Sequence, residues 1–205
     1  MKISPTLTEV KEIAKTGKYD ILPVSCEILS DFITPIEAMR ILQNVSTHCY
    51  LLESAQANEA WGRYTFLGYD PKLEINCIDG HMKLGKLSVE TDNPSEYIRQ
   101  ILSEYKSPKF DYLPSFTGGL VGYFSYDYLG YKEKSIRGKA RDTEDFKDVD
   151  LMLFDKVIAF DNLCQKIILI ANMSLDAPET GYNKAIVELK QLRELLMHGE
   201  KKQNM

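Results

Sequence analysis

The sequence predicts an α+β fold built on largely antiparallel sheets, half of a two-sheet sandwich, with flanking helices. Short strand-like segments follow one another in groups, tight turns connect them, and the helical patterns do not alternate with single strands as a parallel sheet requires. The 205 residues are 44% hydrophobic and 27% charged, which is typical of a folded chain. We therefore expect one domain over residues 1–205.

The first element is a helix that we expect to begin near Pro5 and to end at Gly17. Its apolar stripe at helical spacing consists of Leu7, Val10, Ile13 and Ala14. A strand over residues 19–29 follows. It contains Pro23, which donates no ladder hydrogen bond, so an edge or irregular strand is predicted.

The second helix has the clearest start signal. Thr34, Pro35 and Glu37 are typical of an N-cap, a first helical residue and the carboxylate of a capping box. The helix is expected to continue to about Asn44. Its inward-facing residues are predicted to be Ile36, Met39 and Leu42.

Strand-like segments come next, over residues 48–54, 63–68, 72–78 and 82–89. Asp79-Gly80 joins the last two as a hairpin, because these residues suit the left-handed angles of a primed turn. Asn93, Pro94 and Glu96 then repeat the cap, proline and carboxylate pattern and predict a third helix.

Residues 116–131 combine glycines with many aromatic side chains. We expect Gly118, Gly119 and Gly122 to serve backbone packing rather than phosphate binding, since no helix start follows them. A charged surface excursion is expected over 130–148. After it, a hairpin of residues 151–160 and 165–171 around Asp161-Asn162 and a helix over 179–197 complete the chain.

Composition excludes several classes of function. With 30 acidic and 25 basic residues the formal net charge is −5, so we expect no nucleic-acid partner. No apolar run is long enough for a membrane span, and the N-terminus lacks the apolar core of a signal peptide; the expected localisation is cytoplasmic. The four cysteines and three histidines show no metal-ligand spacing, so no metal is expected to bind this chain alone.

The common catalytic motifs are absent, but the end of the segment Leu51–Ser54 has binding potential. Glu53 can pair with an α-ammonium group, and the Ser54 hydroxyl or a backbone N–H with an α-carboxylate. Neighbouring residues of a strand point to opposite faces, so Glu53 and Ser54 are not a catalytic dyad. The simpler interpretation is a strand end whose polar groups face water. Arg63 is interpreted as a structural ion-pair partner.

Four motifs together resemble one family. TPIEAMRIL at residues 34–42, LLES at 51–54, GRYTFLGYDP at 62–71 and FTGGLVGYFSYD at 116–127 are similar, in this order, to the N-terminal region of anthranilate synthase component I. The resemblance covers roughly residues 5 to 195. LLES and GRYTFLG are more similar to this enzyme than to aminodeoxychorismate synthase component I.

The resemblance implies a function in tryptophan biosynthesis. Members of the family convert chorismate to anthranilate and pyruvate with Mg²⁺, take ammonia from a glutamine amidotransferase subunit, and are inhibited by L-tryptophan. It implies that Ser54 is the main tryptophan contact, with Glu53 and the backbone of Leu52 beside it. The chorismate-binding and Mg²⁺-binding motifs of the family lie in a C-terminal region absent from these 205 residues, so no catalytic residue is assigned and the chain alone is expected to be inactive.

Two alternatives remain open. The first is the matching region of aminodeoxychorismate synthase component I, which uses the same substrate. The second is a non-catalytic module that binds an amino acid or docks a partner.

Overall fold

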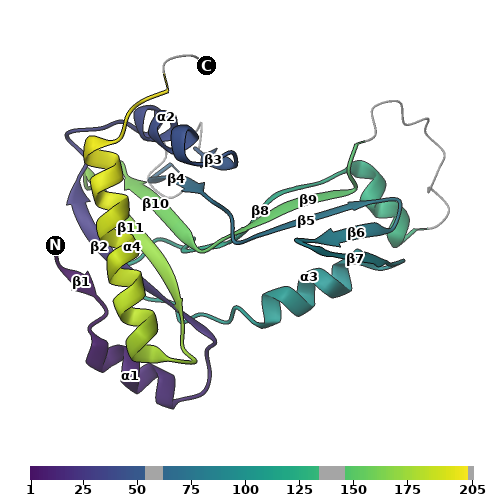
Figure 1. Ribbon diagram of the computed structural model, residues 1–205, viewed down its shortest axis with the longest axis horizontal. Helices are drawn as coiled ribbons and strands as arrows, with labels where there is room; N and C mark the ends of the chain where they lie inside the picture. Colours follow the sequence, from purple (N-terminus) through teal and green to yellow (C-terminus); the bar gives the residue numbers. More distant parts are fainter. Residues whose placement is uncertain (54–61, 134–145, 203–205) are drawn as a thin grey trace. The chain divides into compact units, whose positions relative to one another are not determined.

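Two antiparallel sheets and their helices are seen in the computed structural model, which describes residues 1–53, 62–133 and 146–202 (Figure 1). This confirms the predicted α+β class. The chain divides into two compact units, one of residues 1–70, 105–118 and 155–205, the other of residues 71–104 and 119–154. The interpretation of residues 1–205 as a single domain stays a prediction.

The first unit is built on a six-stranded sheet. From edge to edge its strands are β1 (Ile3–Ser4), β2 (Ile21–Leu29), β11 (Lys166–Ser174), β10 (Lys156–Asp161), β4 (Tyr64–Tyr69) and β3 (Cys49–Leu52). Pro23 lies in β2 beyond the reach of β1, which pairs with Ser25 and Cys26. At Pro23, β2 is therefore an edge strand, the environment in which proline is tolerated.

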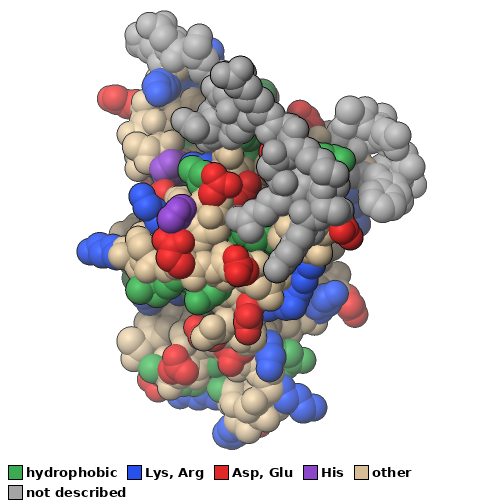
Figure 2. All heavy atoms as spheres, turned by 90° about the vertical axis from the view of Figure 1, so that its right-hand side faces the viewer, with side chains coloured by type: hydrophobic (Ala, Val, Ile, Leu, Met, Phe, Trp, Pro, Cys, Tyr) green, Lys and Arg blue, Asp and Glu red, His purple; other side chains and the backbone are tan. Residues whose placement is uncertain are grey.

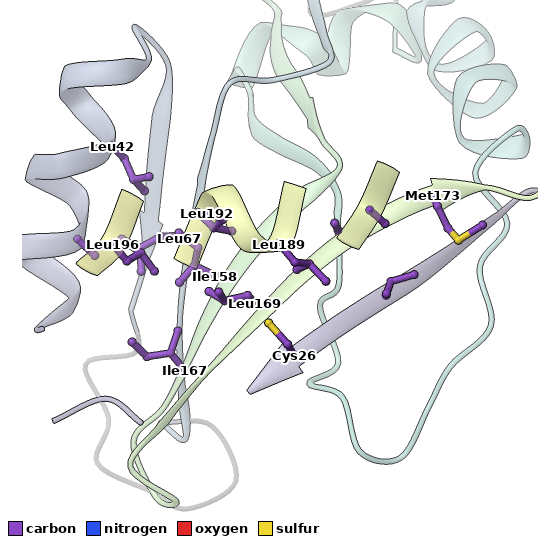
Figure 3. Packing of buried hydrophobic residues seen from close by; sticks show 14 of the residues in the cluster. Cys26, Leu42, Leu67, Ile158, Ile167, Leu169, Met173, Leu189, Leu192 and Leu196 are labelled. Atoms are coloured by element: carbon purple, nitrogen blue, oxygen red, sulfur yellow. The ribbon is translucent and has the colours of Figure 1, made fainter. Parts of the chain in front are cut away.

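Three helices cover one face of this sheet. They are α1 (Leu7–Lys15), α2 (Pro35–Val45) and α4 (Pro178–His198), and α4 lies against the strands β2 and β11 (Figure 1). Leu189 and Leu192 of α4 lie over Leu169 and Ile158 of the sheet in one buried cluster (Figure 3). These residues of α4 thus belong to the core that joins the helices to the sheet.

The opposite face of the six-stranded sheet is covered by the segment 105–118. Leu113 is buried there, and Phe110 and Phe116 pack against the same cluster. The sheet residues that they cover are Val157, Ala159, Ile168 and Ile170. This sheet is therefore buried on both faces, which explains why β10 and β11 are nearly continuous apolar runs.

The helix starts show how local sequence fixes these elements. In α2 the Glu37 N–H donates to the Thr34 hydroxyl (3.3 Å) and the Thr34 N–H donates to the Glu37 carboxylate (3.1 Å), which confirms the predicted capping box. The same box forms between Thr6 and Glu9 at the start of α1. Pro5 therefore precedes the N-cap instead of opening the helix.

The second unit contains a five-stranded sheet in the order β7 (Leu87–Glu90), β6 (His81–Leu84), β5 (Leu73–Ile78), β9 (Val149–Phe154) and β8 (Gly119–Phe124). Asp79 and Gly80 have φ angles of 49° and 86°, as the predicted hairpin turn requires. The helix α3 (Pro94–Ser103) and the 3₁₀-helix η1 (Tyr126–Tyr131) belong to this unit, and Ile98, Tyr128 and Tyr131 pack against its sheet.

Gly122 has a packing role in this sheet. A Cβ atom placed on it would lie 1.9 Å from the carbonyl oxygen of Asp150 on β9, and its φ is 152°. Since only glycine accepts both the close approach and this angle, the backbone-packing interpretation of the glycine-rich segment is supported at this position.

Two strand boundaries and the orientation of one helix residue differ from those predicted. The single strand predicted over residues 151–160 is two strands, β9 and β10, which enter different sheets on either side of Asp155. The predicted strand 82–89 is β6 and β7, joined at Gly85, whose φ is 59°. Ile36 is 51% exposed, because the buried side of α2 is formed by Ala38, Ile41 and Leu42.

The surface is mixed in charge. On the face shown in Figure 2, acidic and basic side chains are interspersed outside the grey atoms, as expected from similar numbers of both kinds. Within the described ranges, no helix is long and apolar enough to cross a membrane.

Candidate functional site

The strand β3, which leads into the predicted tryptophan contacts, is the last strand of the six-stranded sheet and pairs with β4. Its side chains alternate between the two faces. Cys49 and Leu51 pack against the core on the helical side, whereas Tyr50 and Leu52 point to the opposite face. In the sequence, the polar residues of LLES thus come directly after an edge strand that is held by pairing with β4 and by core packing.

The Tyr50 side chain is tightly packed near this strand end. Its ring lies so close to Gly68 of β4 that a Cβ atom on Gly68 would be 2.2 Å from the Tyr50 Cε1 atom. Phe116 meets Tyr50 edge-on with ring centroids 6.4 Å apart, and meets Phe66 at 5.6 Å. Burial raises the pKa of the Tyr50 hydroxyl, so this group stays neutral.

Leu52 and Glu53, by contrast, are exposed to solvent. Leu52 pairs with Phe66 on β4 and is 46% exposed, and Glu53 follows the strand as an exposed residue. Ser54 lies outside the described residues. A carboxylate in this position is available to a cationic ligand, and an exposed leucine beside it offers apolar contact.

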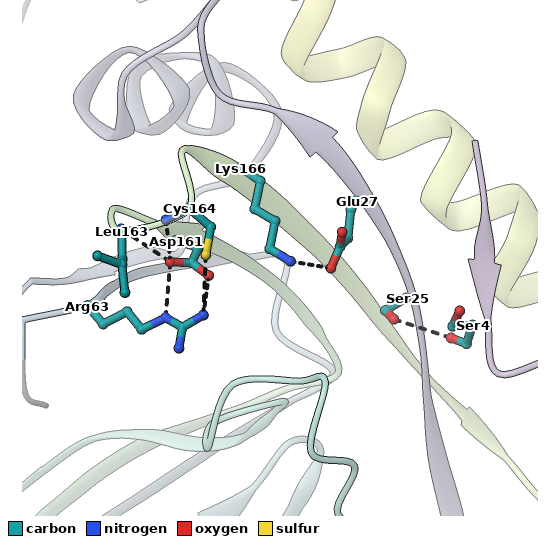
Figure 4. A network of polar contacts seen from close by, with 8 residues as sticks. All are labelled: Ser4, Ser25, Glu27, Arg63, Asp161, Leu163, Cys164 and Lys166. Carbon is teal, nitrogen blue, oxygen red and sulfur yellow. Dashed lines mark hydrogen bonds and ion pairs between the residues drawn. The ribbon is translucent and has the colours of Figure 1, made fainter. Parts of the chain in front are cut away.

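Arg63, directly before β4, forms an ion pair with Asp161, the last residue of β10 (Figure 4). Nε donates to Oδ1 at 3.1 Å and Nη2 donates to Oδ2 at 2.7 Å, which is a bidentate pair. The guanidinium also lies over the Tyr64 ring, 4.9 Å from its centroid. The predicted ion pair of Arg63 is thereby confirmed, with Asp161 as the partner.

Asp161 accepts further hydrogen bonds from the backbone. The N–H groups of Leu163 and Cys164 donate to its Oδ1 at 3.2 and 3.0 Å. Burial alone would raise the pKa of this carboxyl, but the hydrogen bonds from Arg63 and Cys164 outweigh it and lower the pKa to about 2. Sequence reasoning treated Asp161 as a turn residue; an aspartate that caps the N–H groups two and three residues on is the available signal.

An exposed carboxylate and a guanidinium flank residues 54–61 in the sequence. Glu53 precedes this segment and Arg63, whose side chain is 36% exposed, follows it. The Glu53 carboxylate is available to the ammonium group of a free amino acid, whereas the Arg63 guanidinium is bound by Asp161.

A second polar network lies in the other unit. The Tyr131 hydroxyl donates to the Asp148 carboxylate at 2.6 Å and accepts from the Gly80 N–H at 2.7 Å. The Asp79 N–H donates to the same carboxylate at 2.9 Å. The network joins η1, the β5–β6 turn and the start of β9. Because these hydrogen bonds connect three separate segments of the unit, we assign the network a structural role.

No metal site is found in the ranges 1–53, 62–133 and 146–202, where no three histidine, cysteine or acidic side chains converge. No catalytic step is assigned to the side chains described.

The chain matches no family model. It is 34% identical over 198 residues to anthranilate synthase component 1 of Acetivibrio thermocellus, a match that covers 94% of this chain and 39% of the relative. It is 35% identical over 196 residues to anthranilate synthase component 1 of Pseudomonas aeruginosa, covering 92% and 39%. The chain corresponds to an N-terminal region of anthranilate synthase component I.

A solved structure agrees with this correspondence. Anthranilate synthase component I from Streptococcus pneumoniae is 26% identical and superposes with a TM-score of 0.52, over 81% of this chain and 36% of that chain. The chain thus spans about 39% of the length of the curated relatives and matches an N-terminal region of anthranilate synthase component I. The four motifs that carried the resemblance identified the family correctly.

Proposed function

We propose that this chain is the tryptophan-sensing region of an anthranilate synthase component I. The main support for the proposal is sequence identity: the chain is about one third identical, over nearly its whole length, to proteins with that name. The chemistry at the end of β3 is the second support, because Glu53 and Leu52 are exposed on an anchored edge strand.

In the proposed complex, the Glu53 carboxylate pairs with the α-ammonium group of L-tryptophan. Ser54 is the principal contact, and the backbone of Leu52 supplies a further polar group. The firm packing of Tyr50 below the strand supports this model, since a site whose residues are already ordered loses little entropy when it binds a ligand.

The complete polypeptide is proposed to form anthranilate and pyruvate from chorismate with Mg²⁺, using ammonia from a glutamine amidotransferase subunit. The names of the relatives support the reaction, and the chain spans about 39% of the length of those relatives. On this proposal, residues 1–205 alone have no synthase activity.

Inhibition follows from linkage between two sites. If tryptophan favours one conformation of the enzyme and chorismate with Mg²⁺ favours another, each ligand weakens the binding of the other by the same factor. This proposal requires that tryptophan raise the apparent KM for chorismate.

The test uses the complete polypeptide with its amidotransferase subunit. Ser54→Ala should raise the tryptophan concentration for half-inhibition by about tenfold or more, which corresponds to the loss of one good polar contact. Activity without tryptophan should stay unchanged. Ser88→Ala, at an exposed position on β7, is the matched control. Unchanged inhibition in Ser54→Ala would refute the assigned site.

Product analysis of the same enzyme tests the reaction. Anthranilate with pyruvate supports the proposal, whereas 4-amino-4-deoxychorismate without pyruvate would identify an aminodeoxychorismate synthase. Tryptophan binding without either product would leave a non-catalytic amino-acid-binding module as the function.

A further inference from the structure

A cleft of about 410 Å³ lies beside α1, in the first unit. Its apolar walls are formed by Pro5, Ile13, Phe110 and Tyr112, and Glu9 and Glu12 of α1 bring carboxylates to it. Small-molecule sites in proteins have volumes of about 300–1,000 Å³ and combine apolar walls with a few polar groups, and this cleft has both properties.

The aromatic wall of the cleft is ordered. The rings of Phe110 and Tyr112 are stacked, with centroids 5.1 Å apart and an interplanar angle of 23°. A turn in which the Leu113 N–H donates to the Phe110 carbonyl oxygen at 3.0 Å holds this segment, and Leu113 itself is buried. Tyr112 is nevertheless 46% exposed, so a large part of its ring is available for contact.

The charge at the cleft is negative and fixed in place. The Glu9 carboxylate accepts from the Thr6 N–H and the Thr6 hydroxyl, each at 2.7 Å, and these hydrogen bonds lower its pKa. Glu9 therefore stays ionised at neutral pH. Burial and the nearby charge of Glu9 raise the pKa of the Tyr112 hydroxyl to about 12. The negative charge of Glu9 thus disfavours ionisation of Tyr112, a residue of the same cleft.

We propose that this cleft binds a small organic cation, an ammonium or guanidinium group carried on a flat apolar body. The body would stack on Tyr112, whose ring face attracts cations, and the cationic group would pair with Glu9. Glu12 is the second carboxylate, although Lys15 already pairs with it at 2.7 Å. An anionic ligand of the same shape is disfavoured by both carboxylates.

This site is separate from the proposed tryptophan site. Ser4 of β1 also lines the cleft, and β1 and β3 are the two opposite edges of the six-stranded sheet. The two proposals can therefore fail independently, and neither one needs the other.

The test is calorimetric titration of 2-phenylethylamine into the complete polypeptide, with 3-phenylpropionate as the anionic counterpart of the same shape. Saturable binding of the amine, and weaker or no binding of the acid, is expected. Binding should persist in saturating L-tryptophan. Absence of saturable binding, equal binding of the acid, or displacement by tryptophan would overturn the proposal.

Two variants locate the probe. Glu9→Gln removes the charge but keeps a side chain that completes a capping box, and it should weaken binding by about threefold. Glu37→Gln makes the same change in the matching box of α2, away from the cleft, and should have no effect. Tyr112→Leu should also weaken binding by about threefold, while Tyr126→Leu, at a highly exposed tyrosine, should not. Unchanged binding in both Glu9→Gln and Tyr112→Leu would refute the site.

Discussion

The carboxylate of Asp161 has no exposed surface and is held by both Nε and Nη2 of Arg63. The two residues are 98 positions apart in the sequence, and their pairing joins the start of β4 to the end of β10. Because β4 also pairs with β3, this ion pair stabilises the sheet at the end where the proposed tryptophan site lies.

Replacement of Arg63 should be strongly destabilising. Arg63→Met leaves a buried carboxylate without its cation, and we expect a loss of about 3 kcal/mol, the lower end of the range for broken buried pairs because Arg63 is partly exposed. Urea denaturation measures the loss. Lys15→Met, which breaks an exposed pair with Glu12, is the control and should cost less than about 1 kcal/mol. Similar losses in the two variants would contradict the assigned burial.

The same pair predicts a dependence of stability on pH. The pKa of Asp161 is about 2 in the folded chain and about 3.9 in an unfolded chain, so the folded state holds its proton less tightly. Its stabilising contribution is complete above about pH 4 and is lost as the pH falls towards about 2. Over this interval the free energy of unfolding should fall more steeply in the wild type than in Asp161→Asn. Parallel curves would show that Asp161 does not titrate as the structure indicates.

Gly68 should not tolerate a side chain. In Gly68→Ala the new Cβ would overlap the Tyr50 ring, and displacement of this ring should cost about 1–3 kcal/mol. Combination with Tyr50→Leu, which removes the ring, should make the alanine less costly than it is alone. A double-mutant cycle by chemical denaturation measures this coupling, and strict additivity would show that the two positions are independent.

The Tyr131 hydroxyl should contribute to the stability of the second unit. Tyr131→Phe removes a donor to Asp148 and an acceptor for the Gly80 N–H, and we expect a loss of about 1–3 kcal/mol. Tyr126→Phe, at an exposed ring, is the matched control and should change stability by less than about 0.5 kcal/mol. Hydrogen exchange of the Gly80 amide gives a local measure and should become faster in Tyr131→Phe alone.

Elements with strong local signals were predictable from the sequence. The capping box at Thr34 and the turn at Asp79-Gly80 each depend on neighbouring residues only, and both formed as expected. The division of residues 151–160 at Asp155 was not predicted, although the charged residues Asp155 and Lys156 interrupt the apolar run there. What divides it is pairing with different sheets, a property of the whole fold.

The candidate site shows the same limit. The position of Leu52 and Glu53 at a strand end followed from local pattern, but the support beneath them did not. Phe116 contacts Tyr50, and Asp161 contacts Arg63, across long stretches of sequence. A single sequence indicates that Arg63 needs a partner and does not indicate which acidic residue provides it.

The central pair of the five-stranded sheet joins distant parts of the chain. Ile75 on β5 lies opposite Leu151 on β9, and the chain passes between the two units at residues 70–71, 104–105, 118–119 and 154–155. No single cut separates the units into continuous polypeptides. Because a long loop must close before β5 and β9 pair, this sheet is expected to form late in folding, after the β10–β11 hairpin, whose strands are neighbours in sequence. During synthesis, the second unit therefore stays incomplete until residue 154 has emerged from the ribosome.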